Sequence, residues 1–210
     1  MGAVIPTRAR DRSRQRGRTR RAILAAALEI MGRGEKPSVR AVAEAAEVSR
    51  RTVYLHFPTL EQLLTEAALE PVRLQVEEAL VLAESDDVDT RLDILVRAAL
   101  ESSIVREVPL RTLVRITVEH RLDELKGGPP LEAPLRGGRR IEWIESALEP
   151  VRERIDPDHF ERLVSALAMV IGLEALLVLR DIRGLDQTGM EDVSRWASGA
   201  LLRASLQESG

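Results

Sequence analysis

The sequence predicts an all-α fold, and three observations lead to that prediction. Apolar residues make up 44% of the 210 residues and aromatic residues 2%, and the chain is rich in Ala, Leu, Arg and Glu. This mixture favours packed helices over sheets. Apolar residues recur at helical spacing through most of the chain, and no segment of useful length alternates as a strand would. The chain has no cysteine, which excludes disulfides and thiolate metal sites.

Charge is divided unevenly along the chain. Residues 1–60 contain 13 Lys and Arg against 5 Asp and Glu, whereas residues 61–210 contain 18 against 29. A basic end on an acidic remainder suggests a polyanionic partner, although a solvated basic tail gives the same pattern. No apolar run reaches the roughly 18 residues that a membrane span needs. No apolar segment directly follows the basic N-terminus, as a secretory leader would. We therefore expect a cytoplasmic protein without a membrane partner.

The first helix is expected to begin near Thr19. In residues 1–17 arginines alternate with polar or small residues and no apolar stripe is present, a pattern that predicts a disordered basic arm. From Thr19 onward Ile23, Ala27 and Ile30 share one helical face. Glycines at 32 and 34 then end the helix.

Two short helices follow, separated by a tight turn at Glu47-Val48. Ser38 is a plausible N-cap for the first, and Ser49 opens the second, which ends at Phe57-Pro58. Small apolar residues are expected to face inward: Val42, Ala43, Ala46, Val48 and Val53. The second helix then exposes hydrogen-bond donors: Ser49, Arg50, Arg51, Thr52, Tyr54 and His56. These features define a helix-turn-helix, whose second helix enters the major groove of DNA, where arginine pairs with guanine.

The rest of the chain is predicted to be helical as well. Thr59 and Gln62 have capping-box spacing and begin a helix to about Glu84, which Pro71 would kink or divide. Further helices are expected from Asp87 or Asp89 to Glu107, Pro109 to Leu125, Arg139 to Ile155, Asp156 to Asp181, and from a second capping box at Thr188 and Glu191 to Leu206. The segment 127–138 is expected to be a loop.

Residues 19–64 resemble the DNA-binding domain of the TetR family of repressors. The resemblance is strongest over VSRRTVYLHF, residues 48–57, followed by a new helix start at Thr59. It implies a three-helix DNA-binding domain with a helix-turn-helix over 18–77, after the basic arm 1–17, and a larger helical effector-binding and dimerisation domain over 78–210. It also implies a homodimeric transcriptional repressor that binds a pseudo-palindromic double-stranded operator and is released by a small-molecule effector.

The resemblance also implies roles for single residues. Ser38 and Arg40 would contact phosphates; Arg50, Arg51 and Leu55 would face base edges; and Ser49, Thr52, Tyr54 and His56 would complete the surface that positions the motif on the backbone. Two positions depart from the family pattern. Glu47 stands where glycine is common, and a left-handed turn there would cost about 1 kcal/mol. Leu60 stands where a lysine is common, so the arginine arm would have to compensate, for example in the minor groove.

The C-terminal part offers candidates for an effector pocket and a dimer interface. Polar groups set in apolar faces suggest a pocket formed by Arg115, Glu119, His120 and Glu174 with Trp143 as a wall, although each could be an ordinary salt bridge or surface group. The segment 156–183 is apolar nearly all round, which suggests a partner on one side. We expect a four-helix dimer interface that includes Leu167, Ile171, Trp196 and Ala200, with burial inside one chain as the alternative.

Two other classes of function compete with DNA binding. An enzyme would need a cluster of acid-base or metal-binding groups, but His56, His120 and His159 lie far apart and no catalytic motif is present. We therefore expect no enzymatic activity, no metal and no cofactor. A helical adaptor that binds protein without sequence-specific DNA binding would not need the polar face of residues 49–56.

Overall fold

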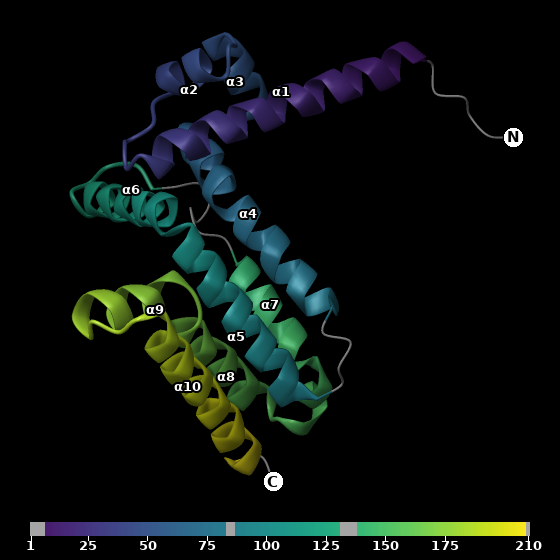
Figure 1. The fold of residues 1–210 in the computed structure, drawn as a ribbon, viewed down its shortest axis with the longest axis vertical. Coiled ribbons are helices and arrows are strands. Elements are labelled where there is room, and N and C mark those ends of the chain that lie inside the picture. Colours follow the sequence, from purple (N-terminus) through teal and green to yellow (C-terminus); the bar gives the residue numbers. More distant parts are fainter. Residues whose placement is uncertain (1–6, 83–86, 131–137, 209–210) are drawn as a thin grey trace, which may run out of the picture. The chain divides into compact units, whose positions relative to one another are not determined.

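The computed structural model describes the backbone of residues 7–82, 87–130 and 138–208, and side chains from residue 13 onward. Within these ranges every regular element is helical, which confirms the all-α prediction (Figure 1). The elements are α1 Thr7–Gly32, α2 Val39–Ala45, α3 Arg50–His56, α4 Leu60–Leu82, α5 Val88–Val105, α6 Glu107–Leu125, α7 Arg139–Leu148, η1 Glu149–Arg154, α8 Pro157–Val170, α9 Leu173–Leu177, η2 Val178–Ile182 and α10 Gln187–Glu208.

The chain divides into two compact units. The head unit combines Met1–Leu69 with Arg111–Leu135, and the body unit combines Glu70–Leu110 with Arg136–Gly210. Helices α4 and α6 each contribute to both units. The boundary between the two compact units lies between Leu69 and Glu70 of α4, several residues before the expected functional division after residue 77. That functional division stays a prediction.

The core of the head unit is formed by α1, α2, α3 and the start of α4. Its buried side chains include Ile23, Ala27, Met31, Val42, Ala43, Val53, Phe57, Leu63 and Leu64. Removing these apolar surfaces from water is the main force that holds these helices together. The α6 segment joins them because Thr112 Oγ1 donates to the Met31 carbonyl over 3.4 Å and Lys36 Nζ pairs with Glu119 Oε2 at 2.5 Å.

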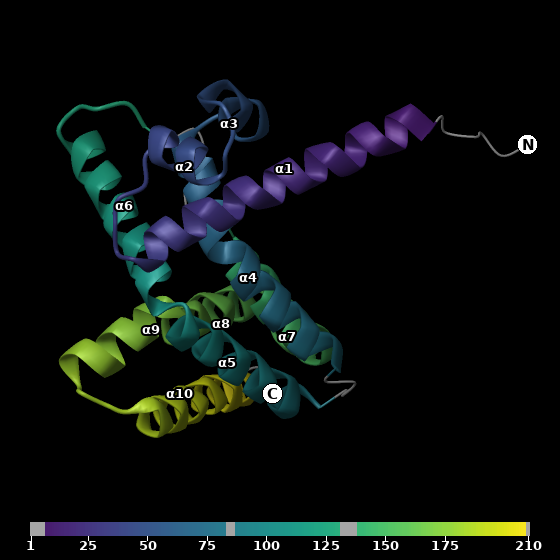
Figure 2. The same cartoon turned by 45° about the horizontal axis from the view of Figure 1, so that its top comes forward.

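Helix α1 is longer than the sequence pattern predicts. It begins at Thr7 rather than near Thr19, so the expectation of a disordered arm is wrong from Thr7 on, and residues 1–6 lie outside the described ranges. Arginine and glutamine are good helix formers, and a helix already nucleated in the core extends at little cost. Figure 2 shows this N-terminal half of α1 reaching past α2 and α3.

The body unit is built around α5, α7, α8 and α10. Helix α10 packs on α5 and α8, and α7 packs on the same two helices (Figures 1 and 2). Fully or nearly fully buried side chains fill the space between them: Leu92, Leu95, Ile144, Leu148, Phe160, Leu163, Leu167, Ile171, Leu176 and Leu202.

The helix predicted over 156–181 is wrong in one respect, because it breaks at Gly172. This residue has φ 104°, a conformation that favours glycine. The guanidinium of Arg140 fills the bend: Nη1 donates to the Ala168 carbonyl over 2.9 Å, and Nη2 pairs with Glu174 Oε2 at 2.7 Å. A Cβ at position 172 would lie 2.9 Å from this guanidinium. A side chain from another helix therefore fixes the break.

The course of α4 and the first residues of α4 and α10 were also predicted from the sequence. Pro71 does not divide α4, which runs unbroken from Leu60 to Leu82. Thr59 caps α4 as predicted, because its Oγ1 accepts from Gln62 N over 3.1 Å. For α10 the predicted cap at Thr188 is wrong, since Asp186 Oδ1 accepts from Gly189 N over 2.8 Å.

Among the described helices none is by itself long and apolar enough to cross a membrane. The bent pair Pro157–Val170 and Leu173–Ile182, with 45° between its halves, meets the length and composition requirement only when both halves are counted together. The buried residues of α8 belong to the core of the body unit.

Candidate nucleic-acid interface

Both short helices of the head begin with a serine N-cap, as predicted. Ser38 Oγ accepts from Ala41 N over 3.1 Å, and Ser49 Oγ accepts from Thr52 N over 3.0 Å. The Ser49 and Thr52 hydroxyls also lie 2.8 Å apart, within hydrogen-bonding distance. These caps satisfy amides that would otherwise lack partners and fix where α2 and α3 begin.

The turn between α2 and α3 is a helix C-cap with a left-handed residue. Val48 N donates to the Ala43 carbonyl over 2.9 Å, and Glu47 N donates to the Glu44 carbonyl over 3.2 Å. This pair of bonds is the Schellman arrangement, in which the residue after the cap normally is glycine. Here that residue is Glu47 with φ 53°, so the left-handed turn whose cost the family resemblance raised is present. The turn keeps its geometry at the expense of backbone strain.

Helix α3 presents most of its surface to solvent. Val53 and Phe57 are buried in the head, whereas Tyr54 is 53% and Leu55 66% exposed. Arg50 and Arg51 are exposed, and no ion pair is recorded for either among the described residues. Large apolar side chains exposed beside unpaired arginines are suited to contact with base edges and methyl groups.

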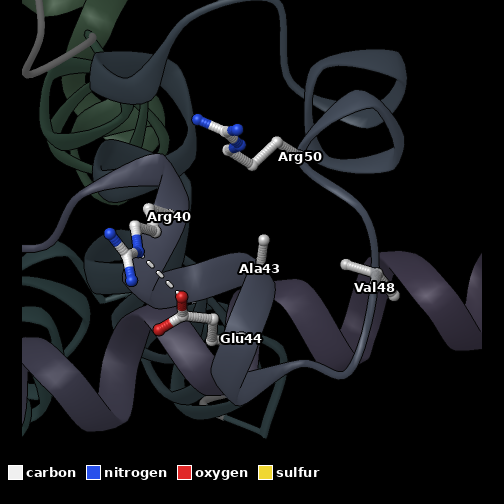
Figure 3. A pocket seen from close by; sticks show the side chains of 5 residues that line it. All are labelled: Arg40, Ala43, Glu44, Val48 and Arg50. Atoms are coloured by element: carbon white, nitrogen blue, oxygen red, sulfur yellow. Dashed lines mark hydrogen bonds and ion pairs between the residues drawn. The ribbon is translucent and has the colours of Figure 1, made fainter.

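A hollow of about 390 Å³ lies between α2 and the start of α3, lined by Arg40, Ala43, Glu44, Val48 and Arg50 (Figure 3). Arg50 extends from α3 toward Arg40, and Arg40 Nε donates to Glu44 Oε1 over 2.8 Å. Glu44 is not among the predicted site residues, although its i,i+4 spacing from Arg40 could have indicated the pair. A carboxylate inside this cationic hollow opposes the approach of a phosphate.

Helix α1 is fastened to the end of the motif by Arg20. Its Nη2 donates to Glu66 Oε2 over 2.7 Å, and its guanidinium lies 4.7 Å from the centroid of the Phe57 ring. The adjacent His56 is half-buried. Burial, followed by the positive charges of Arg16 and Arg20, lowers the pKa of His56 below its ordinary value. Nothing in the sequence pattern pointed to these contacts.

The residues predicted to line an effector pocket are not gathered in one unit. Arg115, Glu119 and His120 belong to the head, where Glu119 pairs with Lys36 at 2.5 Å and His120 Nε2 lies 3.5 Å from a Glu124 oxygen. In the body, Trp143 is half-buried and Glu174 pairs with Arg140. For Glu119 and Glu174 the structure shows the salt bridge that was the alternative interpretation, and the pocket itself stays a prediction.

The predicted dimer residues divide into two groups. Leu167 and Ile171 are 0% and 1% exposed, so their assignment to an interface is corrected: they form the core of their own body unit. Helix α8 packs its buried face against α7 and α10, whereas Glu161, Arg162 and Met169 on its other side are exposed. By contrast Trp196 on α10 is 70% exposed and Ala200 half-exposed, so both remain candidates for a partner contact.

Among the described residues there is no group of three or more His, Cys, Asp or Glu side chains that could bind a metal ion.

Two capped helices around a left-handed turn, the second with exposed arginines, define a helix-turn-helix protein of the DNA-binding class. Residues 23–67 match the family model of the bacterial regulatory proteins of the tetR family. The match identifies residues 23–67 as a DNA-binding segment of the tetR type.

Solved structures share the fold over nearly the whole chain. A TetR transcriptional regulator from Rhodococcus sp. RHA1 is 16% identical with a TM-score of 0.64, and the alignment covers 89% of this chain and 97% of that one. A putative tetR family transcription regulator from Shewanella sp. PV-4 is 21% identical with a TM-score of 0.55, covering 87% and 95%. No curated protein sequence matches the chain.

Proposed function

We propose that the protein is a homodimeric repressor that binds a pseudo-palindromic operator and is released by a small-molecule effector. The observation that carries the DNA-binding part is the solvent-exposed, cationic surface of α3, held on the head core by Val53 and Phe57. In a two-fold dimer the two copies of α3 would enter successive major grooves, about 34 Å apart on one face of the DNA.

The proposal assigns base reading to Arg50, Arg51 and Leu55. Arginine can bond bidentately to guanine, and an apolar side chain can contact the thymine methyl group. The hydroxyls of the caps Ser38 and Ser49 and of Thr52, together with Arg40, Tyr54 and His56, would position the motif on phosphates. Because these groups project from helices with fixed N-caps, they are preorganised for the contact.

Repression requires a switch between two states of the dimer. An effector can release the operator only if it binds more tightly to the state in which the recognition helices are wrongly spaced. We place the dimer contact on α10, around the exposed Trp196 and Ala200. A stable monomer in sedimentation at micromolar concentration would contradict this contact without affecting the DNA-binding proposal.

The operator is found by recovering protein-bound DNA fragments genome-wide and sequencing them. Binding to a recovered site is then measured as a function of salt, since each phosphate contact contributes about −0.9 to the slope of log K against log salt. A steep negative slope supports DNA binding; a slope near zero would favour a protein-binding adaptor instead.

Base reading is tested with Arg50→Ala on the recovered site. The loss expected is about 1–3 kcal/mol, with relaxed preference at one base position. Arg154→Ala, an exposed arginine of the body unit, is the matched control and should leave affinity unchanged. Unaltered base preference in Arg50→Ala would contradict its assigned role.

The proposal includes no catalytic step and no cofactor, and it places the protein in the cytoplasm, where a bacterial chromosome is accessible.

A further inference from the structure

One face of α1 changes character along its length. Arg16, Arg20, Ile23, Ala27 and Ile30 follow one another at spacings of four and three residues, so they share a single stripe of the helix. The last three are buried in the head core, whereas Arg16 is exposed. The stripe that packs on the head therefore becomes cationic where α1 extends past α2 and α3 (Figure 2).

The two arginines of this stripe differ in their partners. Arg20 is engaged by Glu66 and by the ring of Phe57, which fixes α1 against the end of the motif. Arg16 lies one turn further out, about 6 Å along the helix axis. No ion pair is recorded for Arg16 in the described part of the chain, and its charge acts on His56 at the C-terminal end of α3.

The part of α1 around Arg16 whose side chains are described is rich in arginine. Between Ser13 and Leu28 α1 has five arginines and no acidic residue. Many arginines of the body unit are paired with carboxylates, among them Arg73, Arg97, Arg140, Arg162 and Arg195. Arg16, the outer arginine of the stripe, has no recorded carboxylate partner among the described residues, so its charge attracts an anion from outside the chain.

We propose that Arg16 and His56 together hold a phosphate of the DNA backbone at the edge of the groove that α3 enters, which makes α1 a further DNA-contacting element beside α2 and α3. The inference rests on the proposed function, because α3 must dock for the stripe to reach the backbone. Phosphate is the favoured occupant because an arginine and an imidazole donate to its oxygens, and because contacts to the backbone outnumber those to bases in such complexes.

The chain offers controls with the same change of charge. Arg14 and Arg18 flank Arg16 in sequence but project from nearly the opposite side of the helix, about 160° around its axis. A general electrostatic effect would be nearly equal for all three arginines, whereas a phosphate contact is specific to the stripe.

The experiment measures binding of the full-length protein to a random-sequence duplex of about 30 base pairs by fluorescence anisotropy over a range of salt. Arg16→Gln is expected to weaken binding at least threefold at low salt and to reduce the salt slope by about 0.9 per protomer. Arg14→Gln and Arg18→Gln should each produce less than half of that change. Equal effects of all three variants would overturn the inference.

The double variant Arg16→Gln with His56→Gln tests whether both side chains share one phosphate. If they do, the second substitution adds little to the first, whereas fully additive losses would refute a shared site. A wild-type salt slope near zero would refute the proposed function itself, so the two failures are distinguishable. Far-UV circular dichroism checks that each variant retains its helices.

Discussion

The turn between α2 and α3 allows a quantitative test of strain at Glu47. The residue has φ 53° and occupies the position after the α2 cap where glycine is normal. Replacement by glycine should relieve the strain without altering the two hydrogen bonds of the turn. Replacement by alanine removes the same carboxylate but retains a Cβ. The difference in stability between Glu47→Gly and Glu47→Ala therefore isolates the contribution of the backbone conformation.

The expected difference follows from two opposing contributions. A left-handed residue with a Cβ costs about 1–2 kcal/mol, and glycine avoids this cost. Glycine also gives the unfolded chain more freedom, which lowers stability by about 0.4–1 kcal/mol. Taken at the middle of each range, these contributions leave the glycine variant more stable than the alanine variant by about 0.8 kcal/mol, which corresponds to about fourfold in an opening equilibrium.

Native-state hydrogen exchange followed by mass spectrometry measures this opening locally. Protection factors of amides in peptides spanning the turn, which include Val48, should be about fourfold higher in Glu47→Gly than in Glu47→Ala. Peptides from α8 in the body unit serve as an internal control and should not change. Equal protection in the two variants, or greater protection with alanine, would refute the strain argument.

Three other outcomes are expected. Glu44→Gln should strengthen binding to random duplex DNA about threefold or more, because Arg40 becomes available to a phosphate; unchanged anisotropy titrations would count against this. Because the pKa of His56 is lowered in the head and a bound phosphate favours its charged form, DNA affinity should rise as pH falls from 8 to 6. The free energy of unfolding should decrease as pH falls through the lower part of that range, since His56 binds more protons in the unfolded chain than in the folded protein. His56→Gln should flatten the affinity profile, and a profile as steep as that of the wild type would exclude His56 as the cause. Gly172→Ala should destabilise the body by about 1–3 kcal/mol, because φ 104° is a conformation that alanine rarely adopts and the Arg140 guanidinium, 2.9 Å from the new Cβ, must shift; tryptophan fluorescence during urea unfolding measures this loss of stability.

The short elements of the head could be predicted because their signals are local. Ser38, Ser49 and Thr59 each accept a bond from an amide three residues ahead, so a serine or threonine at the right spacing is enough to place the start of a helix. The exposed face of α3 follows from the inward-facing Val53, and the strain at Glu47 follows from the turn. Caps and turns involve neighbours in sequence, and such information is present in the chain itself.

Features that depend on distant side chains could not be read in this way. The break at Gly172 requires Arg140 from another helix, and the anchoring of α1 requires Glu66 and Phe57 beside Arg20. Leu167 and Ile171 were assigned to an interface because an all-round apolar helix has two explanations, and hydrophobicity alone does not distinguish a partner from a chain's own neighbours. The extent of α1 was underestimated because an apolar stripe was required for every part of a helix.

The composition of the head unit restricts how this protein can be re-engineered. The head unit consists of two separate stretches of the chain, Met1–Leu69 and Arg111–Leu135. The roughly forty residues between them belong to the body unit. Thr112 and Glu119 of the second stretch contact Met31 and Lys36. A chimera that grafts only the first 69 residues onto a foreign sensor would leave these partners behind, so transplanting specificity intact requires both pieces.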